Sequence, residues 1–214
     1  MNMPYSATFT SRSSTRDFIA ANLHSFQKET GPGVCFLVYS IMLSHGIEEC
    51  RKEMDETSNR LIVDYGYCAQ ELVNLCTLGK AVSHVHSGEC EFAGKILRGV
   101  EGESCVGLLS LLEHFKYVEV GKTLKSPRYP IWIVYSESHY SMLFSPKLIN
   151  DSNLFDLWYY DGLANQDEEI RLTVRCNANV PEDNEDDLVP PLNRVIRTKW
   201  PGAEIDWNGV EPLL

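Results

Sequence analysis

The sequence predicts an α+β domain in which N-terminal helices are followed by an antiparallel sheet. Two observations lead to this prediction. Residues 14–126 hold helix-like apolar patterns, whereas residues 127–214 hold short β-branched and aromatic runs separated by polar turns. Helices gathered before a series of neighbouring strands are typical of the α+β class. Residues 1–13 are rich in Ser and Thr and are expected to form a disordered leader.

Four helices are expected in the helical part, over residues 15–28, 34–43, 67–78 and 104–115. Ser14 and Ser104 precede the first and the last of them, where a serine hydroxyl can cap the free N–H groups. The second follows the break Gly31-Pro32-Gly33 and is apolar on nearly every side, which predicts a buried helix. Gly79 stands where the third should end, because glycine favours the left-handed conformation that terminates helices.

Four strands are expected in the sheet-rich part, over residues 131–135, 139–144, 155–160 and 170–174. Short polar turns separate them, including 136–138 and the turn dipeptide Asp161-Gly162. Beyond the sheet, the acidic segment 181–187 is expected to be a solvated loop. A short helix is expected over 192–199, directly after Pro190-Pro191.

The net charge limits the classes of partner. The chain has 30 acidic and 19 basic residues, a formal net charge of −11. Nucleic-acid phosphates need clustered Lys and Arg, so we expect no nucleic-acid partner. We also expect no membrane partner, because no apolar run approaches the roughly 18 residues of a spanning helix and the N-terminus has no signal-peptide stretch. An acidic surface suits a basic partner, but solubility alone explains it.

The cysteine content indicates a reducing compartment. The chain has seven cysteines: Cys35, Cys50, Cys68, Cys76, Cys90, Cys105 and Cys176. Their number is odd, no CxxC occurs, and several lie in apolar runs, as is typical of free thiols that pack as small hydrophobes. We therefore expect the protein in the cytoplasm or the nucleus.

One cysteine–histidine group could supply a metal site. Cys76, His84, His86 and Cys90 are side chains that zinc accepts, but structural zinc sites usually pair their ligands as CxxC or HxxxH. Neither spacing occurs here. The simpler interpretation is a polar loop after Gly79, and no metal or cofactor is expected.

His139 is the candidate catalytic residue. It follows a short polar turn and begins a strand, and a thiol protease needs an imidazole fixed on a rigid element as its base. A third group must hold the ring in one tautomer; Asp156, Asp161 and Asn165 are near in sequence, and Asp156 and Asn165 are retained as orienting partners. The alternative is that His139 is only an interfacial residue at a strand edge.

Cys35 is the runner-up nucleophile. It follows Gly31-Pro32-Gly33 at the start of a helix, where the helix N-terminus favours a thiolate. Cysteine is, however, among the most buried residue types, and this helix is apolar on every side. Core packing is therefore the preferred interpretation.

Several ordered segments carry a family resemblance: 66–75 (GYCAQELVNL), 79–83 (GKAVS), 130–141 (PIWIVYSESHYS), 155–166 (FDLWYYDGLANQ), 170–173 (IRLT), 196–200 (IRTKW) and 206–209 (DWNG). Together they resemble the MINDY deubiquitinases from about Asp17 to the C-terminus. The resemblance implies an atypical papain-like fold, of which this chain is a part. It also implies hydrolysis of isopeptide bonds in degradative polyubiquitin chains, with ubiquitin as the partner and His139 as the general base.

The chain departs from the family at the nucleophile. In the family the resemblance implies a Gly-Gly-Pro-Cys segment opening an early helix, with a glutamine just upstream; no such segment occurs here. The order in Gly31-Pro32-Gly33-Val34-Cys35 differs, and its flanks match a later helix. We therefore expect the chain by itself to be a poor hydrolase and to expose an apolar face.

Three hypotheses follow from these residues. The first is a thiol-dependent deubiquitinase whose nucleophile segment is missing from this sequence. The second is an inactive, ubiquitin-binding pseudoenzyme fragment that uses the sheet and the aromatic tail with Trp200 and Trp207. The third is an unrelated hydrolase in which Cys35 and His139 approach within hydrogen-bond reach.

Overall fold

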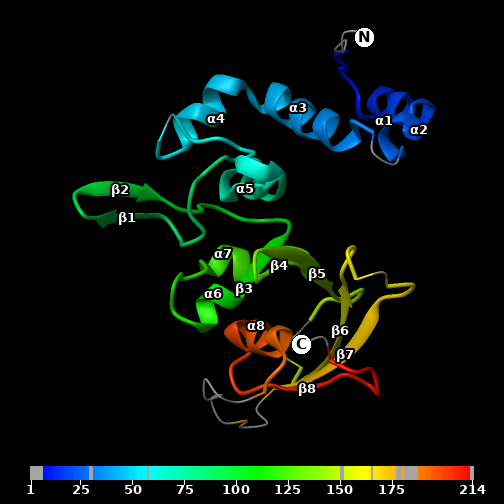
Figure 1. Cartoon of the computed structure of the whole chain (residues 1–214), viewed down its shortest axis with the longest axis vertical. Helices are drawn as coiled ribbons and strands as arrows, with labels where there is room; N and C mark the ends of the chain where they lie inside the picture. The colour runs from blue at the N-terminus through cyan, green and yellow to red at the C-terminus, as the bar shows by residue number, and fades with distance from the viewer. Residues whose placement is uncertain are drawn as a thin grey trace. The chain divides into compact units, whose positions relative to one another are not determined.

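The structure is a computed structural model. It describes the chain except residues 1–6, 29–30, 57, 150–151, 165, 177–179, 181–187 and 213–214. The chain divides into two compact units, Met1–Cys50 and Arg51–Leu214, and helix α4 (Ile47–Glu53) crosses the boundary between them (Figure 1). Within the described ranges, no helix is both long and apolar enough to cross a membrane.

The N-terminal unit begins with a broken helix. Instead of one helix over 15–28, α1 (Arg12–Ala21) ends at Asn22 and α2 (Leu23–Gln27) follows it. The cap is Ser11, whose hydroxyl accepts the N–H of Ser14 at 3.2 Å. The predicted cap, Ser14, is therefore wrong, because the serine run offers several caps and the earliest one is used. The helix also begins inside the segment that was expected to be a disordered leader.

Helix α3 (Gly33–His45) packs closely against α2 at its first residue. A Cβ atom on Gly33 would lie 2.0 Å from the carbonyl oxygen of Phe26. No side chain fits at that distance, so glycine is required where the two helices meet. The rings of Phe26 and Phe36 then contact each other edge to face at 6.1 Å.

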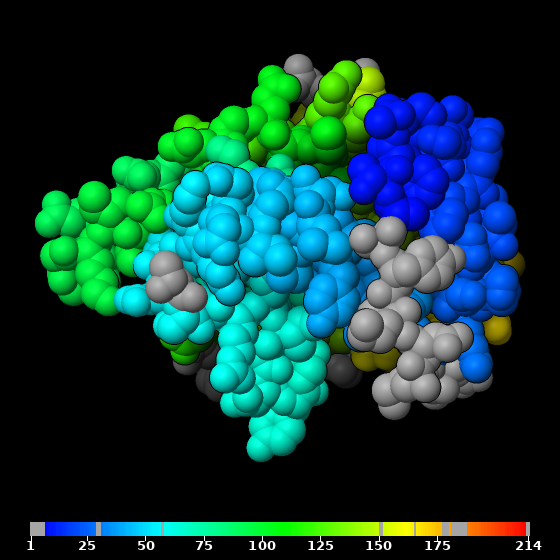
Figure 2. Space-filling view, turned by 90° about the horizontal axis from the view of Figure 1, so that it is seen from above, coloured from blue at the N-terminus to red at the C-terminus, as the bar shows by residue number. Residues whose placement is uncertain are grey.

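The expected burial of α3 is wrong. Only Gly33 and Val38 are buried in this helix, and four large side chains are exposed: Val34, Leu37, Tyr39 and Leu43. Figure 2 shows the helix (light blue) at the surface. An apolar pattern on all sides predicts burial without specifying a neighbour, and the described residues cover only one side. The exposed apolar face expected from the sequence is therefore present.

The C-terminal unit confirms one predicted helix and replaces another. Helix α5 (Gln70–Leu78) ends as predicted at Gly79, which adopts a left-handed conformation with φ of 73°. The helix predicted over 104–115 is wrong: residues Gly107–Ser110 form strand β3, and α6 (Leu111–His114) begins only after it. The cap is Ser110, whose hydroxyl accepts the N–H of Leu112 at 3.1 Å, in place of Ser104. All four residues of β3 are buried, and a short apolar run of that kind does not distinguish strand from helix.

The region predicted to be helical also contains a hairpin that the sequence pattern did not reveal. Strands β1 (Glu89–Phe92) and β2 (Lys95–Arg98) pair with each other as a separate two-stranded sheet. Ala93 and Gly94 both have positive φ in the turn, 51° and 77°, as a two-residue primed turn requires. A second short helix, α7 (Lys122–Lys125), completes this part of the unit.

The predicted meander forms the centre of a six-stranded sheet with the order β3-β4-β5-β6-β7-β8. Four of its strands match the predictions closely: β4 (Ile131–Ser136), β5 (His139–Phe144), β6 (Leu154–Tyr160) and β7 (Ile170–Arg175). These neighbours pair antiparallel, and β8 (Glu204–Asp206) extends them at one edge. At the other edge β3 pairs with β4 in parallel, so the expected sheet is antiparallel except for its first pair. The observed class is α+β.

One face of the sheet builds the main core with α8 (Pro191–Lys199), which confirms the predicted helix over 192–199. Helix α8 lies along this face in Figure 1. It buries Leu192, Val195 and Ile196 against the sheet. The sheet contributes buried residues from five strands: Leu109, Trp132, Val134, Leu143, Leu157, Tyr159, Leu172 and Val174. The acidic segment 181–187, predicted as a loop, lies outside the described residues.

A second apolar cluster includes Ile133 and Tyr140 with side chains from the preceding segments. Its buried members are Val73, Val82, Val100, Leu108, Val120 and Leu124. Burial, together with smaller contributions from the neighbouring Tyr135 and Cys68, raises the pKa of Tyr140 to about 12. Tyr140 therefore keeps its proton in the folded protein at a pH where a solvated tyrosine has lost it.

We expect this tyrosine to make the protein less stable in alkali. Because the folded pKa is raised, stability is fully present below about pH 10 and is lost as pH rises toward about 12, by roughly 1 kcal/mol after allowing for solvent screening. Urea unfolding between these pH values should show the fall in the wild type and a smaller fall in Tyr140→Phe. Tyr117→Phe, at an exposed site, is the control and should behave like the wild type.

Candidate active site

His139 is held at the first position of β5 by a tight turn. It pairs with Ser136 on β4, and only Glu137 and Ser138 lie between them. Both turn residues have positive φ, 50° and 64°, which a two-residue primed hairpin requires and glycine or asparagine adopts more easily. Strain of this kind persists only where the surrounding structure enforces it, so the position of His139 is closely defined.

The imidazole lines a cavity of about 190 Å³ on the face of the sheet that carries α8. Alternation along β5 places His139, Ser141 and Leu143 on this face. The cavity has polar walls and an apolar floor: Val134, Ser136, Glu137, His139, Ser141, Tyr159, Asp161, Pro191, Leu192 and Trp207. A histidine at the rim of the core therefore has solvent on one side and a desolvated floor on the other.

Asp161 is the residue that His139 contacts. The Nε2 atom of His139 lies 2.8 Å from Oδ2 of Asp161, and the imidazole and carboxylate side chains are 35% and 11% exposed. The other carboxylate oxygen, Oδ1, accepts the N–H of Leu163 at 2.9 Å. The N–H of Asp161 in turn donates to Oε1 of Gln166. One hydrogen bond to the carboxylate and one from the backbone of Asp161 thus hold this residue in place beside the imidazole.

This contact selects one tautomer of the histidine. A carboxylate only accepts hydrogen bonds, so Nε2 of His139 carries the proton that it shares with Asp161. In the neutral ring the lone pair is then on Nδ1, which is the atom left to accept a proton. An imidazole oriented by a buried carboxylate in this way is suited to act as a general base.

Tyr159 supports the same carboxylate. Burial raises the pKa of Tyr159 above its ordinary value. A hydrogen bond with Ser141 lowers the pKa in part, while the charge of Asp161 and a hydrogen bond with it raise the pKa. The phenol therefore stays protonated and can donate to Asp161. Tyr159 lies in β6 and Asp161 directly follows that strand. Because the two are two residues apart, their side chains share one face of the sheet.

Of the two orienting partners predicted for His139, the structure describes only Asp156, and this is not the carboxylate that His139 contacts. Asp156 and Tyr159 lie on opposite faces of β6 because side chains alternate along a strand, and Oδ1 of Asp156 accepts the hydroxyl of Thr173 at 2.8 Å. Asn165 lies outside the described residues. Asp161 was among the nearby candidates, and strand parity would have selected it, since it shares the parity of the buried Leu157 and Tyr159. Gln166 was missed because its role depends on the loop conformation.

The predicted core packing of Cys35 is also wrong. Cys35 is exposed in the first turn of α3, in the N-terminal unit, whereas His139 belongs to the C-terminal unit. Exposure leaves its thiol accessible to reagents and substrates. Cys35 therefore keeps its place as the runner-up nucleophile.

The four residues considered as zinc ligands, Cys76, His84, His86 and Cys90, do not converge on one point, and their histidines make separate contacts. Nε2 of His84 lies 2.8 Å from Oδ2 of Asp55, and Nε2 of His86 lies 3.5 Å from the sulfur of Cys90. Burial raises the pKa of the Cys76 thiol, and Cys68 raises it further. In the part of the chain that the structure describes, no three His, Cys, Asp or Glu side chains are grouped to hold a metal ion.

Comparison with known proteins places the chain in a family. The family model "Deubiquitinating enzyme MINDY-3/4, conserved domain" matches residues 3–209. The probable ubiquitin carboxyl-terminal hydrolase MINDY-4 of Mus musculus is 50% identical over 208 residues, which is 92% of this chain and 28% of that protein. The Homo sapiens protein of the same name is 48% identical over 208 residues, with shares of 92% and 27%.

A more distant relative matches a shorter part. The ubiquitin carboxyl-terminal hydrolase MINDY-3 of Danio rerio is 42% identical over 117 residues, 54% of this chain and 26% of that protein. No solved structure matches the chain at a significant level. The chain spans little more than a quarter of the length of these curated relatives. Since the family model covers nearly all of it, the chain belongs to the MINDY deubiquitinase family.

Proposed function

We propose that this chain supplies the general base and its orienting carboxylate to a thiol-dependent hydrolase of isopeptide bonds in polyubiquitin. The observation that carries the proposal is the 2.8 Å contact between Nε2 of His139 and Asp161, which leaves Nδ1 as the proton acceptor. The fold that we propose for the complete catalytic domain is the atypical papain-like fold of the family, of which the described α+β structure would be a part.

The proposed reaction is acyl transfer in two steps. Nδ1 of His139 takes the proton of a cysteine thiol, and the thiolate forms a bond to the carbonyl carbon at the ubiquitin C-terminus. The carbon–nitrogen bond to the lysine breaks, and His139 returns the proton to the leaving amine. Water, deprotonated by His139, then hydrolyses the thioester. The role of Asp161 is to hold the ring and to stabilise the imidazolium that forms.

The thiol in this proposal comes from the family's Gly-Gly-Pro-Cys segment, which this sequence does not contain. The chain by itself is then expected to be inactive. Cys35 is the alternative source, because it is exposed. A family member without a nucleophile would bind ubiquitin without cleaving it, as a pseudoenzyme, and the exposed apolar side chains of α3 favour this second candidate function.

The aromatic tail is a poor candidate for that binding surface. Trp207 is only 6% exposed, and its Nε1 donates to Asn193 at 3.0 Å. The Trp200 ring packs against Phe155 at 5.0 Å. Both indoles are part of the structure of the C-terminal unit, so a ubiquitin contact proposed through this tail finds no support in their burial.

A ubiquitin probe with a thiol-reactive C-terminal group tests the proposed function. We expect the folded chain to bind ubiquitin without forming an adduct, in the wild type and in Cys35→Ala alike. An adduct that forms with the wild type and is absent in Cys35→Ala would instead identify Cys35 as the nucleophile. Absence of any ubiquitin binding, measured by titration of a labelled ubiquitin, would contradict both candidate functions.

The role of Asp161 can be separated from that of Asp156. In a polypeptide that joins this chain to the family's nucleophile segment, Asp161→Asn should lower kcat roughly a hundredfold or more, because the carboxylate no longer holds the tautomer. KM for polyubiquitin and the melting temperature should change little. Asp156→Asn removes a carboxylate from the same strand and should leave kcat within about twofold. A larger loss of kcat in Asp156→Asn would instead support Asp156 as the orienting partner, as predicted from the sequence.

We also propose a reducing compartment, the cytoplasm or the nucleus, for this protein. All seven cysteines lie in the described residues and are free thiols. Free thiols on the surface, as at Cys68 and Cys105, are typical of proteins kept reduced. Imaging of the tagged protein in cells tests this, and secretion would contradict it.

A further inference from the structure

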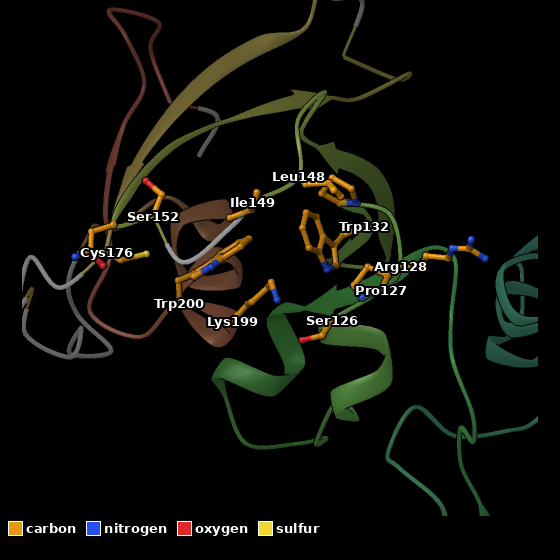
Figure 3. Close-up of a pocket in the computed structure, with 12 residues that line it drawn as sticks. Ser126, Pro127, Arg128, Trp132, Leu148, Ile149, Ser152, Cys176, Lys199 and Trp200 are labelled. Atoms are coloured by element: carbon orange, nitrogen blue, oxygen red, sulfur yellow. The ribbon is translucent and has the colours of Figure 1, made fainter.

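A second cavity of the C-terminal unit lies away from His139. It has a volume of about 450 Å³ and shares no lining residue with the smaller cavity. The end of α8, the start of β4 and the segment after β5 form its walls (Figure 3). A volume of this size is in the range of small-molecule sites.

Two tryptophans give the cavity flat, fixed walls. Trp132 is 2% exposed, and its Nε1 donates to the carbonyl oxygen of Lys125 at 3.0 Å. Trp200 meets Trp132 edge to face at 5.5 Å and packs on Phe155 at 5.0 Å. Trp132 is thus a buried support, and the half-buried ring of Trp200, held by Trp132 and Phe155, is the preformed surface for another planar group.

The positive charge in this cavity belongs to Lys199. Its Nζ atom lies 5.3 Å from the ring centre of Trp132 and 5.0 Å from that of Trp200. Figure 3 shows its side chain directed between the two indoles, whereas the guanidinium of Arg128 points away. Arg128 instead lies over the ring of Tyr129, 5.7 Å from its centre. One ammonium group therefore faces the space between the rings.

Among the described residues, no carboxylate oxygen lies within 4.0 Å of the Lys199 ammonium nitrogen, the limit for an ion pair. The nearby Lys125 is neutralised, because its Nζ lies 2.7 Å from Oε1 of Glu113. Burial lowers the pKa of Lys199, and the charge of Lys125 lowers it further. An ammonium group in a partly dry site is stabilised by a counter-ion, and the protein places none there in its described part.

We propose that this cavity binds a small planar organic carboxylate, whose anionic group pairs with Lys199 and whose ring lies against Trp200, which Trp132 supports from the core. The ligand carboxylate supplies the counter-charge that Lys199 lacks, and the Trp200 ring supplies the stacking area. Apart from Arg128, which points away, the other lining residues are uncharged, Ser126 and Ile149 among them, so no carboxylate of the lining competes for Lys199.

Benzoate and benzamide are the probes that test this site on the intact chain. The two have the same shape and differ in charge. The ¹⁵N-labelled indole signals of Trp132 and Trp200 report binding directly in NMR titrations. We expect benzoate to shift both signals saturably in the millimolar range and benzamide to bind at least about tenfold more weakly, because ion pairing is lost.

Variants at two lysines assign the preference to one charge. Lys199→Met keeps the length of the side chain and should bind both probes equally, whereas Lys199→Arg should still prefer benzoate. Lys147→Met removes an exposed charge from the segment after β5 and should bind like the wild type. The proposal is overturned if the wild type binds benzoate and benzamide equally, or if benzoate leaves both indole signals unmoved; neither comparison depends on whether a variant folds.

Discussion

His139→Ala should lower the rate of polyubiquitin cleavage by about 10³-fold, in a polypeptide that carries this chain together with the family's nucleophile segment. The variant removes the atom that takes the thiol proton and returns it to the leaving amine. Binding of ubiquitin should change little, because the imidazole is a small part of any surface that ubiquitin could contact. Gel-based cleavage of defined polyubiquitin, with ubiquitin titration beside it, measures both quantities.

His84 offers a closely matched control. Its Nε2 atom also lies 2.8 Å from an aspartate oxygen, that of Asp55, and the two side chains are 34% and 14% exposed. By residue type, distance and exposure this pair is nearly the same as His139 with Asp161. The difference is location, since only His139 lines the cavity with Trp207 at its floor.

His84→Ala should therefore leave the cleavage rate within about twofold while lowering stability by about 1 to 3 kcal/mol, the usual effect of losing a charged hydrogen bond. Thermal unfolding of both variants separates the two effects. If His84→Ala lost activity and His139→Ala retained it, the base would have to be sought in the helical part of the chain, and the proposed assignment would be wrong.

The sheet was predictable from sequence because its strands alternate and their turns are marked. The runs before and after residues 136–138 have clear strand chemistry, and the structure places β4 and β5 within one residue of the prediction. The cap of α5 was equally readable, since Gly79 supplies the left-handed residue that ends the helix. In these places a local pattern and the final fold agree.

The errors came where a pattern has no unique partner. Residues 107–110 are uniformly apolar, and only the parallel pairing with β4 makes them a strand. Helix α3 is apolar all round, and burial depends on neighbours that the pattern does not name. For the candidate site, His139 was predicted as the base from the family resemblance together with its place at a strand start. Its contact with Asp161 was not selected from the sequence, because it depends on strand parity and on the conformation of the loop that follows.

Trp207→Ala should be among the most destabilising single substitutions in the C-terminal unit, lowering the free energy of unfolding by about 3 to 5 kcal/mol. The indole is buried in the main core and its Nε1 donates to Oδ1 of Asn193 at 3.0 Å, so it ties the chain after β8 to α8. It also forms part of the floor beneath His139. Urea unfolding followed by circular dichroism measures the loss.

Two further variants separate packing from the hydrogen bond and from tryptophan content alone. Trp207→Phe keeps most of the apolar volume and should cost about 1 to 3 kcal/mol, because the Asn193 side chain loses its donor. Trp158→Ala removes a less buried indole from β6 and should cost less than Trp207→Ala. A Trp158→Ala loss equal to or larger than that of Trp207→Ala would contradict the prediction. If Trp207→Phe retains the fold but slows cleavage, the floor of the cavity matters to His139 beyond its contribution to stability, because a shift of about 1 Å in a catalytic group is enough to cost roughly a hundredfold in rate.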